Sequence, residues 1–233
     1  MSGIWILLVI ILISSIPVIF VYIWYRTAKY QFSPALFLFA LLTGAAAFFP
    51  ALLLQQFLTF SSSTTGRLAL FLQVFVRVAF TEEISRLLLL FLFFLISSRI
   101  RPNENIVMSL SYNSIRYGTA IGLVAGLGFA LLENAVYGAS NSGVLLLRAF
   151  TAAPLHGACG SRIGAAAVMF RASPLQALLR IMAATAIHGI YNFMVTIPGI
   201  PSVAAVLIAL SALLSAIISI HSGGDIELQE QNN

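Results

Sequence analysis

Seven apolar runs, each close to the length of a helix that crosses a lipid bilayer, constrain this chain more than any other feature. A spanning helix needs about 20 apolar residues. The runs cover residues 4–25, 35–57, 67–98, 117–139, 144–170, 175–197 and 202–220. They predict an all-α polytopic transmembrane bundle of about seven spans. We expect residues 1–233 to form a single integral membrane domain, with the polar residues 221–233 as a disordered tail.

The composition supports a bilayer as the solvent for these runs. The chain has 233 residues, of which 60% are hydrophobic and 8% are charged, whereas soluble domains have about 25% charged residues. A soluble chain of this size cannot bury so much apolar surface, because accessible surface scales too steeply with mass. The net charge of +5 is spread between the apolar runs, which argues against nucleic-acid binding.

The basic residues predict an orientation, because they concentrate in the cytoplasmic loops of membrane proteins. The six that lie between the runs follow the first, third and fifth of them: Arg26, Lys29, Arg99, Arg101, Arg116 and Arg171. Arg67 and Arg148 belong to the opposite side. The pattern places the N-terminus outside and the C-terminus in the cytoplasm, in what we expect to be a bacterial cytoplasmic membrane. No basic residue precedes the first run, so we expect a retained span and not a cleaved leader.

The third run is too long for one upright span. As a helix it would extend roughly 48 Å, against a hydrocarbon core of about 30 Å. The sequence leaves two solutions open. The helix tilts strongly, or it breaks near Thr81, just before the paired acids Glu82 and Glu83.

Ionisable residues inside the predicted spans are candidate functional residues, because each costs a few kcal/mol in a bilayer. They lie on the third to sixth runs, with polar neighbours: Glu82, Glu83, Arg86; Glu133, Asn134, Tyr137; Arg148, His156; His188, Tyr191 and Asn192. Helical spacing allows Arg86 to pair with either Glu82 or Glu83. Arg162 and Arg180 are expected to extend toward the cytoplasmic interface. Arg77 would neutralise Glu82 or Glu83 if its segment re-enters the membrane.

Three glycines at four-residue spacing precede Glu133 on the fourth run. Gly118, Gly122 and Gly126 form a repeated pattern of small residues, which lets helix backbones approach closely in membranes. Such an approach would bring polar side chains of different helices into one site.

Three carboxylates, two imidazoles and an amide on four helices match the requirements of a hydrolytic site. A carboxylate can act as general base on water, and histidine or asparagine can donate to an oxyanion. Two histidines with carboxylates could instead hold a zinc ion with an open water position. No serine or cysteine occupies a nucleophile motif, so direct attack by water is the better interpretation. Structural alternatives remain for single residues: a helix cap at Thr81, a Glu133–Arg148 ion pair, or histidines that only pack.

Four motifs in order resemble the PrsW family of intramembrane proteases. They are TEEISR, FALLENAVYG, RAFTAAPLHGACG and IHGIYN, between residues 81 and 192. The set is also similar to a wider superfamily with type II CAAX prenyl endopeptidases and the APH-1 subunit of gamma-secretase. CAAX enzymes carry histidine where this chain has Glu133, so the PrsW family is the closer match. Arg86 replaces a commoner lysine, and Asn192 takes an aspartate-or-asparagine position.

The resemblance implies a membrane-embedded endopeptidase that cleaves a membrane-anchored protein, as in site-1 cleavage of anti-sigma factors. It implies catalytic roles for Glu82, Glu83, Glu133, His156, His188 and Asn192. Supporting roles fall to Arg86, Asn134, Tyr137 and Arg148. If a metal such as Zn²⁺ is used, the candidate ligands are Glu133, His156 and His188. The alternatives are a non-catalytic scaffold of the same fold or a proton-coupled transporter, although no inverted repeat supports the transporter.

Overall fold

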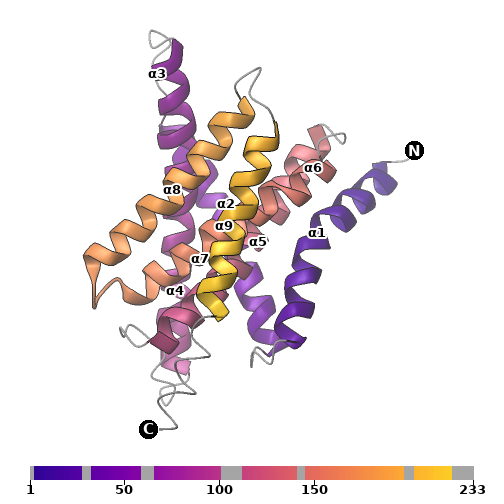
Figure 1. Ribbon diagram of the computed structural model, residues 1–233. Helices are drawn as coiled ribbons and strands as arrows, with labels where there is room; N and C mark the ends of the chain where they lie inside the picture. The colour runs from indigo at the N-terminus through magenta and orange to yellow at the C-terminus, as the bar shows by residue number, and fades with distance from the viewer. Residues whose placement is uncertain are drawn as a thin grey trace.

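The computed structural model describes residues 3–27, 33–58, 66–100, 112–140, 145–196 and 202–221, and every regular element in these ranges is a helix (Figure 1). The tail beyond residue 221 lies outside the described residues. The elements are α1 (Gly3–Thr27), α2 (Pro34–Phe57), α3 (Gly66–Phe71), the π-helix η1 (Leu72–Phe80), α4 (Thr81–Ile100), α5 (Tyr112–Ser140), α6 (Leu145–Phe150), α7 (Ala152–Met169), α8 (Pro174–Thr196) and α9 (Ser202–His221).

The outside of the bundle is apolar. Large hydrophobic side chains on α1, α2, α8 and α9 are more than half exposed, among them Leu12, Phe20, Phe39, Leu175 and Leu214. In the described residues five helices are long and apolar enough to cross a membrane: α1, α2, α5, α8 and α9. The other two predicted spans, α4 and α7, fall outside this group, since α4 begins with charged residues and α7 contains a histidine, an arginine and several glycines. A total of seven spans therefore stays a prediction.

The third predicted run changes its winding at Thr81, where the sequence left a break or a strong tilt open. The helical path continues from α3 through η1 into α4 without a turn, because Thr81 keeps right-handed helical angles (φ −64°, ψ −36°). What changes at Thr81 is the type of helix, from π to α. π-helical segments are rare and often lie at functional sites. Here the π-helix ends at Phe80, two residues before Glu82.

The fifth predicted run is two helices and not one, which corrects the sequence interpretation. The chain leaves helical geometry at Thr151 (φ −124°, ψ −62°), between α6 and α7. Pro154 lies in the first turn of α7. Proline removes a backbone donor and its ring collides with the carbonyl four residues earlier, so a helix starts cleanly there but cannot run through. The short helix α6 carries Arg148.

The predicted close approach of glycine faces is confirmed between α5 and α7. A Cβ atom on Gly126 would lie 2.0 Å from the carbonyl oxygen of His156, and one on Gly122 would lie 2.1 Å from that of Gly160. Only glycine allows the two backbones to meet at these points. The contact makes α7 the central helix, with every residue buried except Pro154 and Arg162.

Candidate active site

The first two turns of α4 carry three buried charged residues, Glu82, Glu83 and Arg86. Arg86 Nη1 lies 2.9 Å from Glu83 Oε2, and Arg86 Nη2 lies 3.6 Å from Glu82 Oε2. The predicted pairing of Arg86 with either carboxylate is therefore present, and the structure shows contacts with both. The capping alternative is wrong, because the Thr81 hydroxyl donates back to Arg77 O (2.6 Å). Glu82 and Glu83 thus lie inside a continuous helical path and not at a free helix start.

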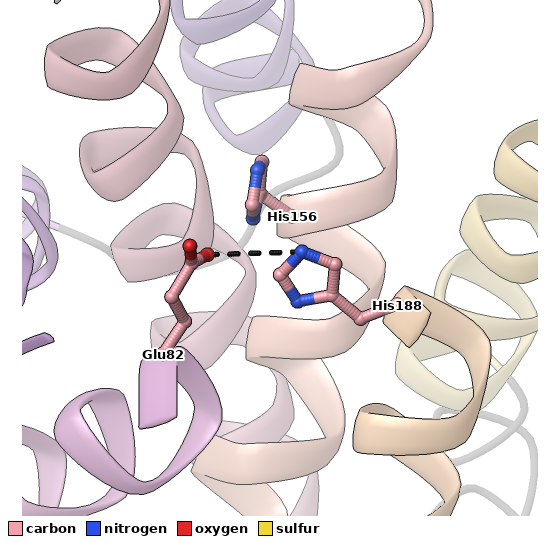
Figure 2. A group of neighbouring side chains, drawn as sticks. All are labelled: Glu82, His156 and His188. Atoms are coloured by element: carbon pink, nitrogen blue, oxygen red, sulfur yellow. Dashed lines mark ion pairs between the residues drawn. The ribbon is translucent and has the colours of Figure 1, made fainter. Parts of the chain in front are cut away.

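His188 on α8 reaches the paired glutamates. Its Nδ1 lies 2.8 Å from Glu83 Oε1, and its Nε2 lies 3.7 Å from Glu82 Oε2. An ionised carboxylate only accepts, so Nδ1–H donates to Glu83 and the lone pair of a neutral imidazole is on Nε2. Figure 2 shows this ring directed at Glu82. Two acceptor atoms then face each other, an arrangement that a proton or a cation between them would stabilise.

His156 on α7 has the same arrangement with different partners. Its Nε2 lies 2.8 Å from Glu133 Oε2, and its Nδ1 lies 3.1 Å from Arg86 Nη2. Since a guanidinium only donates, Nδ1 accepts and Nε2–H donates to Glu133. The two imidazole rings stand edge to face, with centroids 4.9 Å apart. Each histidine therefore has one nitrogen held by a carboxylate and the other directed into the cluster.

Glu133 on α5 is tied to α6 as well as to α7. Arg148 Nη2 donates to Glu133 Oε2, and Arg148 Nε donates to Asn134 Oδ1 (3.0 Å). The Arg148 guanidinium also covers the ring of Tyr137, 4.0 Å from its centroid. The ion pair considered as a structural alternative is present, and it is continuous with the histidines. The break at Thr151 matters here because α6 has a direction of its own, and Arg148 on it contacts Glu133 and Asn134 on α5.

Asn192 is the predicted site residue that the structure does not join to this cluster. It lies one turn beyond His188 on α8. Within the described part of the chain its backbone carbonyl accepts from Thr196 Oγ1 (2.7 Å), and its side chain makes no hydrogen bond. Its neighbour Tyr191 bonds instead to Thr151, with 2.8 Å between their hydroxyl oxygens.

Sequence reasoning missed Gln55, and it expected Arg77 to contact a glutamate instead of its observed partners. Gln55 on α2 donates from Nε2 to Glu82 Oε1 (3.2 Å). Arg77 on η1 donates from Nε to the Gln55 backbone carbonyl (2.8 Å) and from Nη1 to Gln73 Oε1 (3.1 Å). Arg77 therefore supports Gln55 and does not neutralise a glutamate. The signal available for Gln55 was its polar side chain near the end of the apolar run 35–57.

The donor atoms of Glu82, His156 and His188 lie within 4.8 Å of one another and all three residues are buried (Figure 2). This group differs from the predicted ligand set in that Glu82 replaces Glu133, whose carboxylate holds His156 and Arg148. A carboxylate with two imidazoles is a donor set of catalytic zinc. Glu82 Oε2 is buried and accepts no hydrogen bond from any described residue. An ion bound to His156 Nδ1 would require Arg86 to withdraw from that nitrogen.

The charge balance also fits a bound cation or proton. In the described residues the cluster holds three carboxylates, Glu82, Glu83 and Glu133, and two guanidiniums, Arg86 and Arg148. With neutral imidazoles these sum to −1, and buried charge is costly unless it is paired. The residues present therefore fit a metal ion.

Comparison with known proteins agrees with the geometry. A family model described as PrsW family intramembrane metalloprotease matches residues 33–218, which include every residue of the cluster. No curated protein and no solved structure matches the chain significantly. The match covers most of the sequence and reaches beyond the four motifs on both sides. The chain belongs to the PrsW family of intramembrane metalloproteases.

Proposed function

We propose that the cluster of Glu82, Glu83, Glu133, His156 and His188 hydrolyses a peptide bond in a membrane-anchored protein by direct attack of water. The observation that carries this proposal is the convergence of three carboxylates and two imidazoles, from four helices, in one buried site. Family membership supports proteolysis. A single-span substrate cut in the manner of an anti-sigma factor would suit a site enclosed by helices.

Glu82 is the carboxylate that takes the proton from water. Both Glu83 oxygens have partners, since Oε1 accepts from His188 and Oε2 pairs with Arg86. Glu82 Oε1 accepts from Gln55, whereas Oε2 faces the lone pair of His188. A water that contacts Glu82 Oε2 and His188 Nε2 would lose its proton to this carboxylate. Glu83 fixes the ring orientation and tautomer of His188.

Arg86 stabilises the negative charge that develops on the substrate carbonyl. It is fully buried, cannot lose its proton, and its Nε has no hydrogen-bond partner among the described residues. Fixed donors in a buried site stabilise a developing oxyanion strongly. We retain Asn192 as a second donor, which would have to turn toward the substrate. Arg148, Asn134 and Tyr137 hold Glu133, which in turn orients His156.

Glu82, His156 and His188 are the residues that would hold a divalent ion such as Zn²⁺. When bound, such an ion would polarise the carbonyl and lower the pKa of water. Glu83 and Glu133 would then act as the outer carboxylates that orient metal-binding histidines. This use differs from the metal-free one in requiring Arg86 to leave His156, so metal content of the purified protein separates the two.

The membrane topology forms part of the proposal. The helices alternate in direction, so the ends of α1, α4, α7 and α9 lie toward one side of the bundle. Arg26 and Arg171 lie at that side, which we assign to the cytoplasm. The active-site cluster then lies toward the outer side, in a single domain within the cytoplasmic membrane. Reporter fusions to residues 30 and 172, compared with residues 62 and 142, would test the assignment.

The decisive experiment is cleavage of a single-span reporter protein by purified protein in liposomes. We expect Glu82→Gln and His188→Ala to lower the cleavage rate by at least about 100-fold, because a positioned base contributes 10²- to 10⁴-fold. His221→Ala is the matched control, since His221 is exposed at the end of α9. Cleavage by both cluster variants at the wild-type rate would refute the mechanism. A wild-type protein that cleaves none of several reporter proteins would favour the alternative of a non-catalytic scaffold.

A further inference from the structure

A second polar feature lies away from the active-site cluster. An open pocket of about 360 Å³ is lined by Arg162, Gln176, Leu179, Arg180 and Ala183, between α7 and α8. Arg180 precedes His188 by eight residues, about 12 Å along the helix. The pocket therefore lies nearer the connection between α7 and α8, and its volume is in the range of small-molecule sites, roughly 300–1,000 Å³.

The two arginines of this pocket are held differently. Arg162 is bonded between helices, with Nη1 donating to Ala158 O (2.8 Å) and Nη2 donating to Ser215 Oγ on α9 (2.8 Å). Arg180 makes no hydrogen bond or ion pair with any described residue. Arg162 thus has a structural role, whereas Arg180 has all its donors available.

Among the residues that the structure describes, no carboxylate compensates the positive charge of the pocket. The acidic residues that the structure describes, Glu82, Glu83 and Glu133, all belong to the active-site cluster. Two guanidiniums in an apolar bundle repel each other, so a bound anion would stabilise them. Gln176 belongs to the first turn of α8, where the helix dipole also favours negative charge.

We propose that this pocket binds the phosphate of an anionic phospholipid. Exposed leucines of α8 lie beside it, with Leu175, Leu178 and Leu179 at 68%, 50% and 57% exposure, and they offer a surface for acyl chains. Guanidinium groups match the geometry of phosphate oxygens. The pocket faces the side that the basic residues assign to the cytoplasm, where anionic lipid headgroups attract arginine and lysine.

Native mass spectrometry of the purified protein with added phosphatidylglycerol or phosphatidylcholine tests this proposal. We expect one phosphatidylglycerol to bind preferentially to the wild type, and Arg180→Gln to weaken it by roughly tenfold, the effect of one charged hydrogen bond. Arg180→Lys should retain part of the affinity. Arg171→Gln is the matched control, because Arg171 is exposed at the end of α7 and does not line the pocket. Glycerol phosphate, which lacks acyl chains, should bind far more weakly than the lipid.

Two results would overturn the proposal. Equal phosphatidylglycerol binding by wild type and Arg180→Gln would show that the pocket does not recognise the lipid. Equal weakening by Arg171→Gln and Arg180→Gln would show only a general attraction of surface charge. A thermal melt of each variant identifies misfolding, and Arg180→Lys provides a second variant if Arg180→Gln fails to fold. These outcomes do not depend on protease activity.

Discussion

His188 donates from Nδ1 to Glu83 Oε1 over 2.8 Å, although the two residues are 105 positions apart in the chain. The bond fixes which nitrogen of His188 faces Glu82. The same relationship recurs between His156 Nε2 and Glu133 Oε2, also at 2.8 Å. Two histidines held by two carboxylates form a preorganised site, since their rings need not reorient during reaction.

Glu83→Gln is expected to lower the reporter cleavage rate by about 10- to 100-fold, the usual effect of removing a carboxylate that orients a histidine. The amide can still accept from Nδ1–H, but it loses the negative charge that pairs with Arg86. Initial rates in liposomes measure the effect. Glu83→Asp should recover part of the activity because the carboxylate is kept. An unchanged rate for Glu83→Gln would mean that this bond has no part in catalysis.

Gln55→Ala is expected to lower kcat by roughly tenfold or more with little change in KM, because Glu82 loses the donor that directs its carboxylate. Gln55→Glu should be worse, since it places a second negative charge beside Glu82. Progress curves at several substrate concentrations separate kcat from KM. Gln56→Ala is the control, because Gln56 is the exposed neighbour on the same helix. A change in KM alone would point to substrate binding and not to positioning.

The cost of placing charge in a bilayer, together with helical spacing, indicated most of the polar residues that meet. Glu82, Glu133, His156 and His188 were identified because each is costly in a bilayer, and the glycines before Glu133 indicated where helices would touch. Both inferences depend on local sequence and on simple energetics. They do not require knowledge of how the helices are ordered in space, so this part of the site was predictable.

The details that the sequence did not reveal depend on backbone geometry. The grouping of Glu82, and not Glu133, with both histidines as candidate ligands accompanies the π-helical winding before Thr81 and the contact of Arg148 with Glu133. Apolar periodicity does not distinguish π from α winding over nine residues. Pro154 offered a signal for the break at Thr151. Gln55 gave only the weak signal of one polar side chain in a long apolar run.

Gly126→Ala is expected to lower the thermal stability of the purified protein. The added Cβ would lie 2.0 Å from His156 O, so α5 and α7 must separate, at a typical cost of 1–3 kcal/mol. Gly157→Ala on α7 is the matched control, because its Cβ would meet Leu127 at an ordinary 3.4 Å. Melting temperatures in detergent compare the two. Equal stability of both variants would contradict the close packing that aligns Glu133 with His156.

Metal content should distinguish the two possible ligand sets. We expect Glu82→Ala and His188→Ala to remove most bound Zn²⁺, because their donor atoms face each other and Glu82 Oε2 accepts no hydrogen bond from the described residues. Glu133→Ala should lower zinc affinity only about 10- to 100-fold, as expected for a carboxylate that orients a ligand. Elemental analysis after dialysis against graded chelator measures this order. If Glu133→Ala loses zinc before Glu82→Ala does, Glu133 is the ligand and the grouping of Glu82 with the histidines does not describe the metal site.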